Sequence, residues 1–220
     1  MFRVILTTLA LLLAACAPVS GPSAQPKDKS PYVVPAATEA LVRQGKLASA
    51  VFAGGCFWCV ETAFEPLPGV VAVISGFSGG AEKEPTYEDV SSSRTGHIES
   101  VRVLYDPAKV TYERLLEVFW HNIDPTQADG QFCDRGPQYR SAVFFGGPAE
   151  KAAAERTRQA VAAKLPGPVV TELLPFTEFW PAENYHQDFY KKNPEHYRAY
   201  REGCGRDRRL RALWGEEAGH

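Results

Sequence analysis

The sequence predicts a mixed α+β domain built in layers. Segments with strand-like and helix-like patterns alternate along the chain, which is typical of such domains. The hydrophobic content of 45% and the charged content of 23% are close to those of an average globular protein. Once an unusual N-terminal segment is set aside, about 190 residues remain, which suits a single domain with one core.

The first expected strand covers residues 49–53. Apolar residues then recur at helical spacing over 60–67, which predicts a helix stopped by Pro66 and Pro68. A run rich in valine and isoleucine predicts the second strand over 70–77.

The middle of the chain combines long loops with regular elements. Residues 79–93 and 122–138 are polar and are expected to be long loops. Between them, residues 97–105 alternate between apolar and polar, which predicts a strand, and Thr111 is expected to cap a helix.

Four further elements are expected in the C-terminal part. Residues 139–145 and 169–174 favour strands, and the alanine-rich segment 148–164 favours a helix. An aromatic-rich helix is expected over 182–200, interrupted at Pro194.

The N-terminus is typical of an export signal. A basic residue, Arg3, precedes an apolar stretch that is too short to span a membrane and ends in small residues. The run Leu-Ala-Ala-Cys at Cys16 resembles a bacterial lipoprotein signal. We therefore expect a signal peptide over 1–15, lipidation of Cys16, and a location in the cell envelope, anchored by lipid in a membrane facing the periplasm or the exterior.

The segment that follows Cys16 is expected to be a tether. It is rich in proline and small polar residues, so it offers too little apolar surface to fold. We place the lipidated cysteine and a flexible tether at 16–45 and the catalytic domain at 46–215.

The charge of the chain argues against nucleic acid as its partner. Its 24 basic and 26 acidic residues give a net charge of −2, whereas phosphate binding requires a basic patch. The only dense basic cluster, from Arg206 to Arg211, is interpreted as a solvated helix face. Nothing in the sequence suggests more than a monomer.

Cys56 is the strongest candidate for a reactive group. It lies where an expected strand passes through Gly54 and Gly55 into a helix. Free N–H groups at a helix N-terminus favour the thiolate, so a lowered pKa is expected for Cys56. Two aromatic neighbours, Phe57 and Trp58, fit a plain core position poorly.

The other cysteines leave alternatives open. Cys59 completes a Cys-x-x-Cys spacing with Cys56, which fits a redox pair or half of a zinc site with Cys133 and Cys204. The latter two are far apart in sequence, so no metal is expected. A disulfide oxidoreductase that uses Cys56 and Cys59 is the main alternative function.

A second alternative is a serine hydrolase. Ser78 occupies the centre of a Gly-x-Ser-x-Gly run, and Asp134 and His186 follow in triad order. That motif needs a helix directly after the serine, and no apolar helical period follows Ser78. We regard this alternative as weak.

Five blocks of sequence resemble the peptide methionine sulfoxide reductase A family. They occur in the family's order, cover about residues 50 to 190, and are jointly very specific. The blocks are Gly55-Cys56-Phe57-Trp58 with Glu61, Pro85-Thr86-Tyr87-Glu88-Asp89-Val90, Thr95-Gly96-His97-Ile98-Glu99, Gln138-Tyr139-Arg140-Ser141 and Glu183-Asn184-Tyr185-His186-Gln187.

The resemblance implies a two-layer α+β fold with a ferredoxin-like core. It implies reduction of methionine S-sulfoxide, free or in proteins, with no bound cofactor and with a thioredoxin-like dithiol as external reductant. By this resemblance Cys56 is the nucleophile and Glu99 is the proton-donating carboxyl. Tyr87 and Tyr139 are the two hydroxyl donors, and Asp134 is the second carboxylate. Phe57 and Trp58 are the aromatic substrate contacts, and His186 is the orienting histidine.

Two expectations remain to be compared with the structure. A carboxylic acid donates a proton near neutral pH only if burial raises its pKa, so Glu99 should be desolvated and protonated. A second thiol must condense with oxidised Cys56. The family often uses a C-terminal cysteine near glycines, which favours Cys204, whereas proximity along the helix favours Cys59. We rank Cys204 first and Cys133 last.

Overall fold

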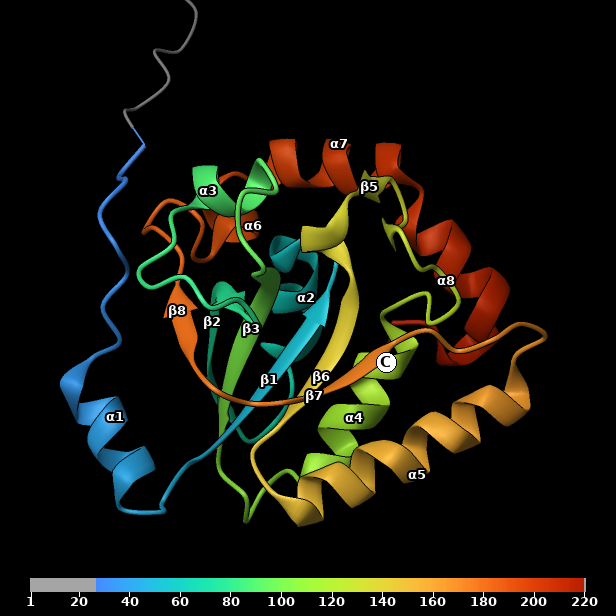
Figure 1. Ribbon diagram of the computed structural model, residues 1–220, viewed down its shortest axis with the longest axis horizontal. Coiled ribbons are helices and arrows are strands. Elements are labelled where there is room, and N and C mark those ends of the chain that lie inside the picture. Colours follow the sequence, from blue (N-terminus) through green and yellow to red (C-terminus); the bar gives the residue numbers. More distant parts are fainter. Residues whose placement is uncertain (1–26, 220) are drawn as a thin grey trace, which may run out of the picture.

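The computed structural model describes residues 27–219 and has a mixed α+β architecture, as the sequence predicts (Figure 1). A six-stranded sheet forms its centre. The elements in chain order are α1 (Ala36–Arg43), β1 (Ala48–Gly54), α2 (Phe57–Phe64), β2 (Val70–Ser78), α3 (Tyr87–Ser91), β3 (Ile98–Tyr105), α4 (Tyr112–His121), β4 (Gly130–Gln131), β5 (Asp134–Arg135), η1 (Pro137–Tyr139), β6 (Ser141–Phe145), α5 (Pro148–Lys164), β7 (Glu172–Pro175), β8 (Phe179–Pro181), α6 (Phe189–Lys192), α7 (Pro194–Cys204), α8 (Arg206–Trp214) and η2 (Gly215–Glu217).

The strand order of the main sheet is β7-β6-β1-β3-β2-β8. Every pairing is antiparallel except that of β6 with β7. Helix α2 connects β1 to β2, and α4 and α5 flank β6 in sequence. Strands β4 and β5 form a separate hairpin, which lies near α7 and α8 (Figure 1).

The main core lies between the sheet and helices α2, α4 and α5. Phe52 of β1 is fully buried and stacks on Phe64 of α2 and Phe119 of α4, with ring centroids 5.0 Å and 5.2 Å away. Side chains alternate along β1, so Val51 and Ala53 face a smaller apolar cluster on the other side of the sheet. The larger cluster fixes the N-terminus of α2 relative to β3.

Several expected elements are confirmed. The helix over 148–164 is observed with those bounds. Thr111 caps α4, because its side chain accepts a hydrogen bond from the backbone N–H of Arg114 at 3.2 Å. Helix α2 ends at Phe64, just before Pro66.

The expected helix over 182–200 is confirmed after residue 188, including its interruption at Pro194, but it is wrong over 182–188. Residues 182–188 form a loop, and two separate helices, α6 and α7, follow it. Asp188 adopts a left-handed conformation with φ of 52°, which breaks any helix at that point. Within the expected loop 79–93, a capping box at Thr86 starts the short helix α3.

Part of the expected tether is folded onto the domain. Residues 36–43 form α1, and Glu39 of that helix pairs with Arg102 of β3 at 2.5 Å. The backbone of residues 28–32 makes three hydrogen bonds to residues 182–185. The ion pair and the backbone hydrogen bonds supply contacts that this segment lacks by itself.

No helix within residues 27–219 is both long and apolar enough to cross a bilayer. The predicted signal peptide at 1–15 and the predicted lipidation of Cys16 lie outside the residues that the structure describes.

Candidate active site

Cys56 is the N-cap residue of α2, one residue past the turn that ends β1. Gly55 makes this turn possible, because its φ is 81° and a Cβ there would lie 2.5 Å from the Cβ of Gln131. The side chain of Cys56 is 6% exposed. The strand-to-helix turn expected around Cys56 is therefore present, but its thiol is more deeply buried than a helix end implies.

Cys56 and Cys59 are free and buried, and their thiols interact with each other. Burial raises the pKa of the Cys56 thiol well above its ordinary value, so the expectation of a lowered pKa is wrong for the resting site. The pKa of Cys59 is lowered to about 6, first by the hydrogen bond from Cys56 and then by the charges of Arg206 and Arg201. The two thiols therefore titrate as a coupled pair, and Arg206 and Arg201 favour a negative charge on Cys59.

Glu99 lies in β3 directly beside the start of α2. Its side chain is 2% exposed, and its Oε2 accepts the backbone N–H of Phe57 at 3.0 Å. Burial raises the pKa of Glu99 to about 8, an effect that the hydrogen bond from Phe57 only partly offsets. Glu99 is therefore desolvated and protonated at neutral pH, as predicted from the sequence.

Cys56 and Glu99 both line a small cavity of about 80 Å³. Seven of its lining residues were predicted from the sequence, and one, Tyr200 of α7, was not. The predicted residues are Cys56, Phe57, Trp58, Tyr87, Glu99, Asp134 and Tyr139.

The two predicted hydroxyl donors stay protonated. Burial raises the pKa of both Tyr87 and Tyr139, and the nearby Glu99 raises both further. Burial also raises the pKa of Asp134, whose Oδ2 accepts the hydroxyl hydrogen of Tyr200 at 2.6 Å. The cavity thus contains one thiol, two carboxyl groups and three phenol groups.

His186 supports the site from behind and does not line the cavity. Its Nδ1 accepts the indole N–H of Trp58 at 3.1 Å, and its ring lies 4.9 Å from that of Phe57. Burial lowers the pKa of His186 to about 3, so the ring is neutral. Phe57 and Trp58 form an aromatic wall of the cavity, and the ring of Phe189 stacks on that of Trp58 with centroids 3.7 Å apart. His186 therefore orients the aromatic wall.

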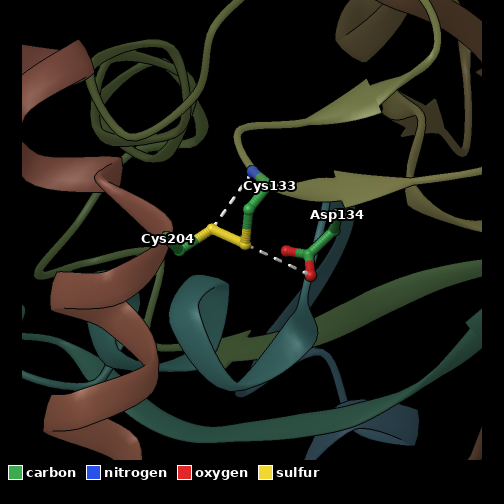
Figure 2. A group of neighbouring side chains, drawn as sticks. All are labelled: Cys133, Asp134 and Cys204. Carbon is green, nitrogen blue, oxygen red and sulfur yellow. Dashed lines mark hydrogen bonds between the residues drawn. A yellow bond between two sulfur atoms is a disulfide. The ribbon is translucent and has the colours of Figure 1, made fainter.

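Cys133 and Cys204 form a disulfide with a Cα–Cα distance of 5.0 Å (Figure 2). Cys204 is thus already paired, and Cys59 is the free thiol beside Cys56. The four cysteines form two pairs, and they do not make the common zinc site that was considered.

Ser78 lies in a structural position. Its Oγ donates to the backbone carbonyl of Glu178 at 2.7 Å, and no helix follows it directly. Asp134 instead faces Tyr200, and His186 accepts from Trp58. The serine hydrolase arrangement is therefore absent from these residues.

Within residues 27–219, two groups of side chains have the composition of a metal site. In the first, Cys133, Asp134 and Cys204 lie within 4.8 Å of one another, but both sulfurs are in the disulfide. In the second, the Lys191 ammonium lies 2.7 Å from both Glu65 and Asp188 and supplies the positive charge itself.

Two residues important to the site were missed in the sequence. Tyr200 lies four residues before Cys204, one helical turn away, and that spacing is the signal that could have revealed it. Arg206 is 1% exposed, which corrects its interpretation as part of a solvated face. Its guanidinium donates to the carbonyl of Gly54 at 3.1 Å and thereby supports the turn before Cys56.

A buried thiol pair facing a protonated carboxylic acid and two phenol donors defines a thiol-dependent reductase. A family model described as peptide methionine sulfoxide reductase matches residues 48–218. The chain belongs to this family and is an oxidoreductase that reduces methionine sulfoxide with thiols.

Relatives and solved structures agree with this assignment. The chain is 51% identical over 180 residues to peptide methionine sulfoxide reductase MsrA 2 of Caulobacter vibrioides, covering 81% of this chain and 91% of that protein. It is 48% identical over 173 residues to the MsrA of Halalkalibacterium halodurans, covering 78% and 98%. The structure is similar to methionine sulfoxide reductase A of Corynebacterium diphtheriae, with a TM-score of 0.63 and 36% identity, covering 72% and 81%.

Proposed function

We propose that this protein acts as a monomer on the S epimer of methionine sulfoxide, free or in oxidised proteins. The main support for this proposal is that Cys56 and Glu99 line one cavity. Cys56 is the nucleophile, and Glu99 is a buried acid with a pKa of about 8. Sulfoxide reduction needs both groups at one point, because the sulfur must be attacked while the oxygen takes up a proton.

The first step transfers the sulfoxide oxygen to Cys56. Cys56 gives its proton to the Cys59 thiolate and attacks the sulfoxide sulfur, while Glu99 protonates the oxygen. The oxygen ends on Cys56 as a sulfenic acid, and methionine leaves as the thioether. The substrate sulfur is reduced by two electrons, and the Cys56 sulfur is oxidised by two.

Aromatic rings and hydroxyl groups hold the substrate for this step. Phe57 and Trp58 contact the S-methyl group, because sulfur and methyl groups pack well on aromatic rings. Tyr87 and Tyr139 donate hydrogen bonds to the sulfoxide oxygen, since both remain protonated.

Cys59 is the resolving thiol that the contacts support. Its thiol, which has taken the proton from Cys56, attacks the sulfenic acid to form a Cys56–Cys59 disulfide, and water leaves. Cys204 was ranked first from the sequence, but the thiol in contact with Cys56 is that of Cys59. A thioredoxin-like dithiol then reduces the new disulfide by exchange.

The second candidate is a disulfide oxidoreductase that uses Cys56 and Cys59. The lowered pKa of Cys59 within a Cys-x-x-Cys spacing favours it. The buried acid Glu99 in the cavity of Cys56 argues against it, because thiol–disulfide exchange needs no proton donor of this kind.

An assay of both sulfoxide epimers with dithiothreitol tests the proposal. We expect reduction of the S epimer alone and complete loss of activity in Cys56→Ser. Peptide mapping after one equivalent of sulfoxide, without reductant, should find Cys56–Cys59. A Cys56–Cys204 linkage would restore the ranking made from the sequence, and activity on protein disulfides but not on sulfoxides would favour the second candidate.

We also propose that the protein is exported and lipid-anchored at Cys16. The support is the Leu-Ala-Ala-Cys run after a short apolar stretch. Mass spectrometry of the mature N-terminus should find a lipid on Cys16, and an unmodified Cys16 would contradict the anchor.

The core is best classed as ferredoxin-like. This proposal is supported by the antiparallel order β6-β1-β3-β2 and by the succession strand, helix, strand, strand, helix, strand that connects them.

A further inference from the structure

The Cys133–Cys204 disulfide joins two segments that both border the cavity of Cys56. Cys133 belongs to the hairpin of β4 and β5, and Cys204 is the last residue of α7. Asp134, the residue after Cys133, lines the cavity, and its Oδ1 lies 3.8 Å from the Cys133 sulfur (Figure 2). The disulfide therefore fixes the distance between the hairpin and α7.

Tyr200 extends from α7 into the cavity. It lies one turn before Cys204 and donates to Asp134 at 2.6 Å. The space that remains is about 80 Å³, whereas ligand sites generally measure about 300–1,000 Å³. With the disulfide formed, Tyr200 is one of the side chains that line and narrow this cavity.

The same disulfide borders a second, larger groove of about 570 Å³. Cys204 lines this groove, together with Arg135, Arg208 and Arg209 and a single acidic side chain, Asp124. Arg209 pairs with Asp124 and Arg135 pairs with Asp129, while Arg208 is exposed and makes no ion pair with any residue of 27–219. Arg208 therefore gives the groove an uncompensated positive charge next to a disulfide sulfur.

We propose that Cys133–Cys204 is a second redox site, that a protein dithiol with an acidic face reduces it through this groove, and that its opening withdraws Tyr200 from the cavity of Cys56. Charge complementarity selects an acidic partner surface. The inference rests on the proposed function, because the site that opens is the one that takes the sulfoxide.

The exchange is balanced in atoms and electrons. One thiolate of the incoming dithiol attacks the Cys204 sulfur, the bond to Cys133 breaks, and Cys133 leaves as a thiolate that takes up a proton. The second thiolate of the dithiol attacks the mixed disulfide and releases Cys204. The dithiol is oxidised to its own disulfide, and the cysteine pair gains two electrons and two protons.

Reduction then frees α7 from the hairpin. Tyr200 is then held in the cavity by its hydrogen bond to Asp134 and by its edge contact with Trp58, with ring centroids 6.0 Å apart. The net contribution of each contact to stability is modest. The open form binds the substrate, and the disulfide form is a closed reserve of the enzyme.

Alkylation of Cys56 by iodoacetamide tests this proposal in the full chain. Protein with Cys56 and Cys59 reduced and Cys133–Cys204 intact is compared with Cys133→Ala/Cys204→Ala. We expect roughly tenfold faster alkylation of Cys56 in the double variant, because the closed form limits access. The wild-type chain, reduced at Cys133–Cys204 in a thiol redox buffer, should match it and covers the case of a poorly folded variant. Equal rates in all three forms would overturn the proposal.

Tyr200→Ala separates the disulfide from the side chain that it holds. In this variant, alkylation of Cys56 should be fast whether Cys133–Cys204 is intact or reduced. Continued dependence on the disulfide would show that Tyr200 is not the blocking group and would refute that part of the proposal.

The groove is tested with two reductants. Thioredoxin should reduce Cys133–Cys204 in Arg208→Glu roughly tenfold more slowly than in wild type, whereas dithiothreitol should act equally on both. Arg211→Glu is the matched control, because Arg211 is exposed on the same helix outside the groove lining. Equal thioredoxin rates in both variants would refute the docking surface.

Failure of the proposed function gives a different result. If even the double variant does not reduce methionine sulfoxide with dithiothreitol, the proposed function fails, while the alkylation rates still report on the disulfide.

Discussion

The two cysteine pairs of this protein lie close to one cavity but in opposite surroundings. Cys56 and Cys59 are three residues apart, buried and reduced. Cys133 and Cys204 are separated by 71 positions, joined by a disulfide, and lie at the surface, with Cys133 exposed. In the first pair, burial and nearby arginines tune the thiols. In the second, the main effect is a covalent link between distant segments.

The difference indicates how spacing and burial divide the work of cysteines. A short, buried spacing places two coupled thiols at one point. A long spacing closes a large loop and so acts on the shape and stability of the chain. Changes to each pair should therefore affect different measured quantities.

The largest expected effect is on stability, from removing the long-range link. Cys133→Ser/Cys204→Ser should lower the free energy of unfolding by about 4 kcal/mol, from the chain entropy of the closed loop. Urea unfolding without reductant measures this loss. Cys59→Ser is the control, because it removes a thiol without opening a cross-link. A loss below about 1 kcal/mol in the double variant would contradict the comparison.

The next effect is on catalysis at the buried pair. Glu99→Gln should lower kcat/KM for methionine sulfoxide by about 10²-fold, because the amide cannot protonate the leaving oxygen. Glu99 is protonated below its pKa of about 8, so wild-type kcat/KM should fall as the pH rises through 8. The Gln variant should lack this fall. An unchanged profile in Glu99→Gln would assign the alkaline limb to another group.

A smaller effect should appear in the titration of Cys59. Arg201 lowers the pKa of Cys59, and Arg201→Gln should therefore move the midpoint of Cys59 alkylation to higher pH. Arg198→Gln is the matched control, because Arg198 is exposed on the same helix. Peptide mass spectrometry across a pH series gives the midpoint of Cys59 alkylation in each variant. Equal midpoints in Arg201→Gln and Arg198→Gln would contradict an effect of Arg201 on the pKa of Cys59.

The smallest effect is expected far from both pairs. Glu39→Gln removes the ion pair to Arg102, whose two side chains are 26% and 18% exposed. The free energy of unfolding should fall by about 1 kcal/mol or less, with kcat/KM unchanged. This variant provides the baseline for the three larger effects, and a loss of activity would show that α1 influences the site.

Much of the site was predictable because its groups lie on regular elements. Cys56 begins a helix, and Glu99 lies in an alternating strand beside it, so the family resemblance could place both correctly. The protonation of Glu99 followed from a requirement of the chemistry and agrees with its burial.

The remaining features depend on contacts that sequence spacing does not encode. The raised pKa of Cys56 does not follow from the sequence, because a helix end indicates partial charge but not the degree of burial. The pairing of Cys133 with Cys204 depends on where α7 docks, and four cysteines allow three pairings. Tyr200 lies in α7 and Arg206 in α8. The position of these two helices beside the site does not follow from the helical pattern expected over 182–200.

The backbone pairing of residues 28–32 with residues 182–185 has a mechanical consequence. Any tension that arrives along the chain from its N-terminal side acts first on three backbone hydrogen bonds, and on the side-chain hydrogen bond from Asn184 to Ser30, at the loop that continues into His186. The central sheet is loaded only after these bonds have yielded. Force on the N-terminal segment would therefore displace His186, which supports Trp58, before the domain unfolds. The rate of catalysis would then depend on the tension in that segment.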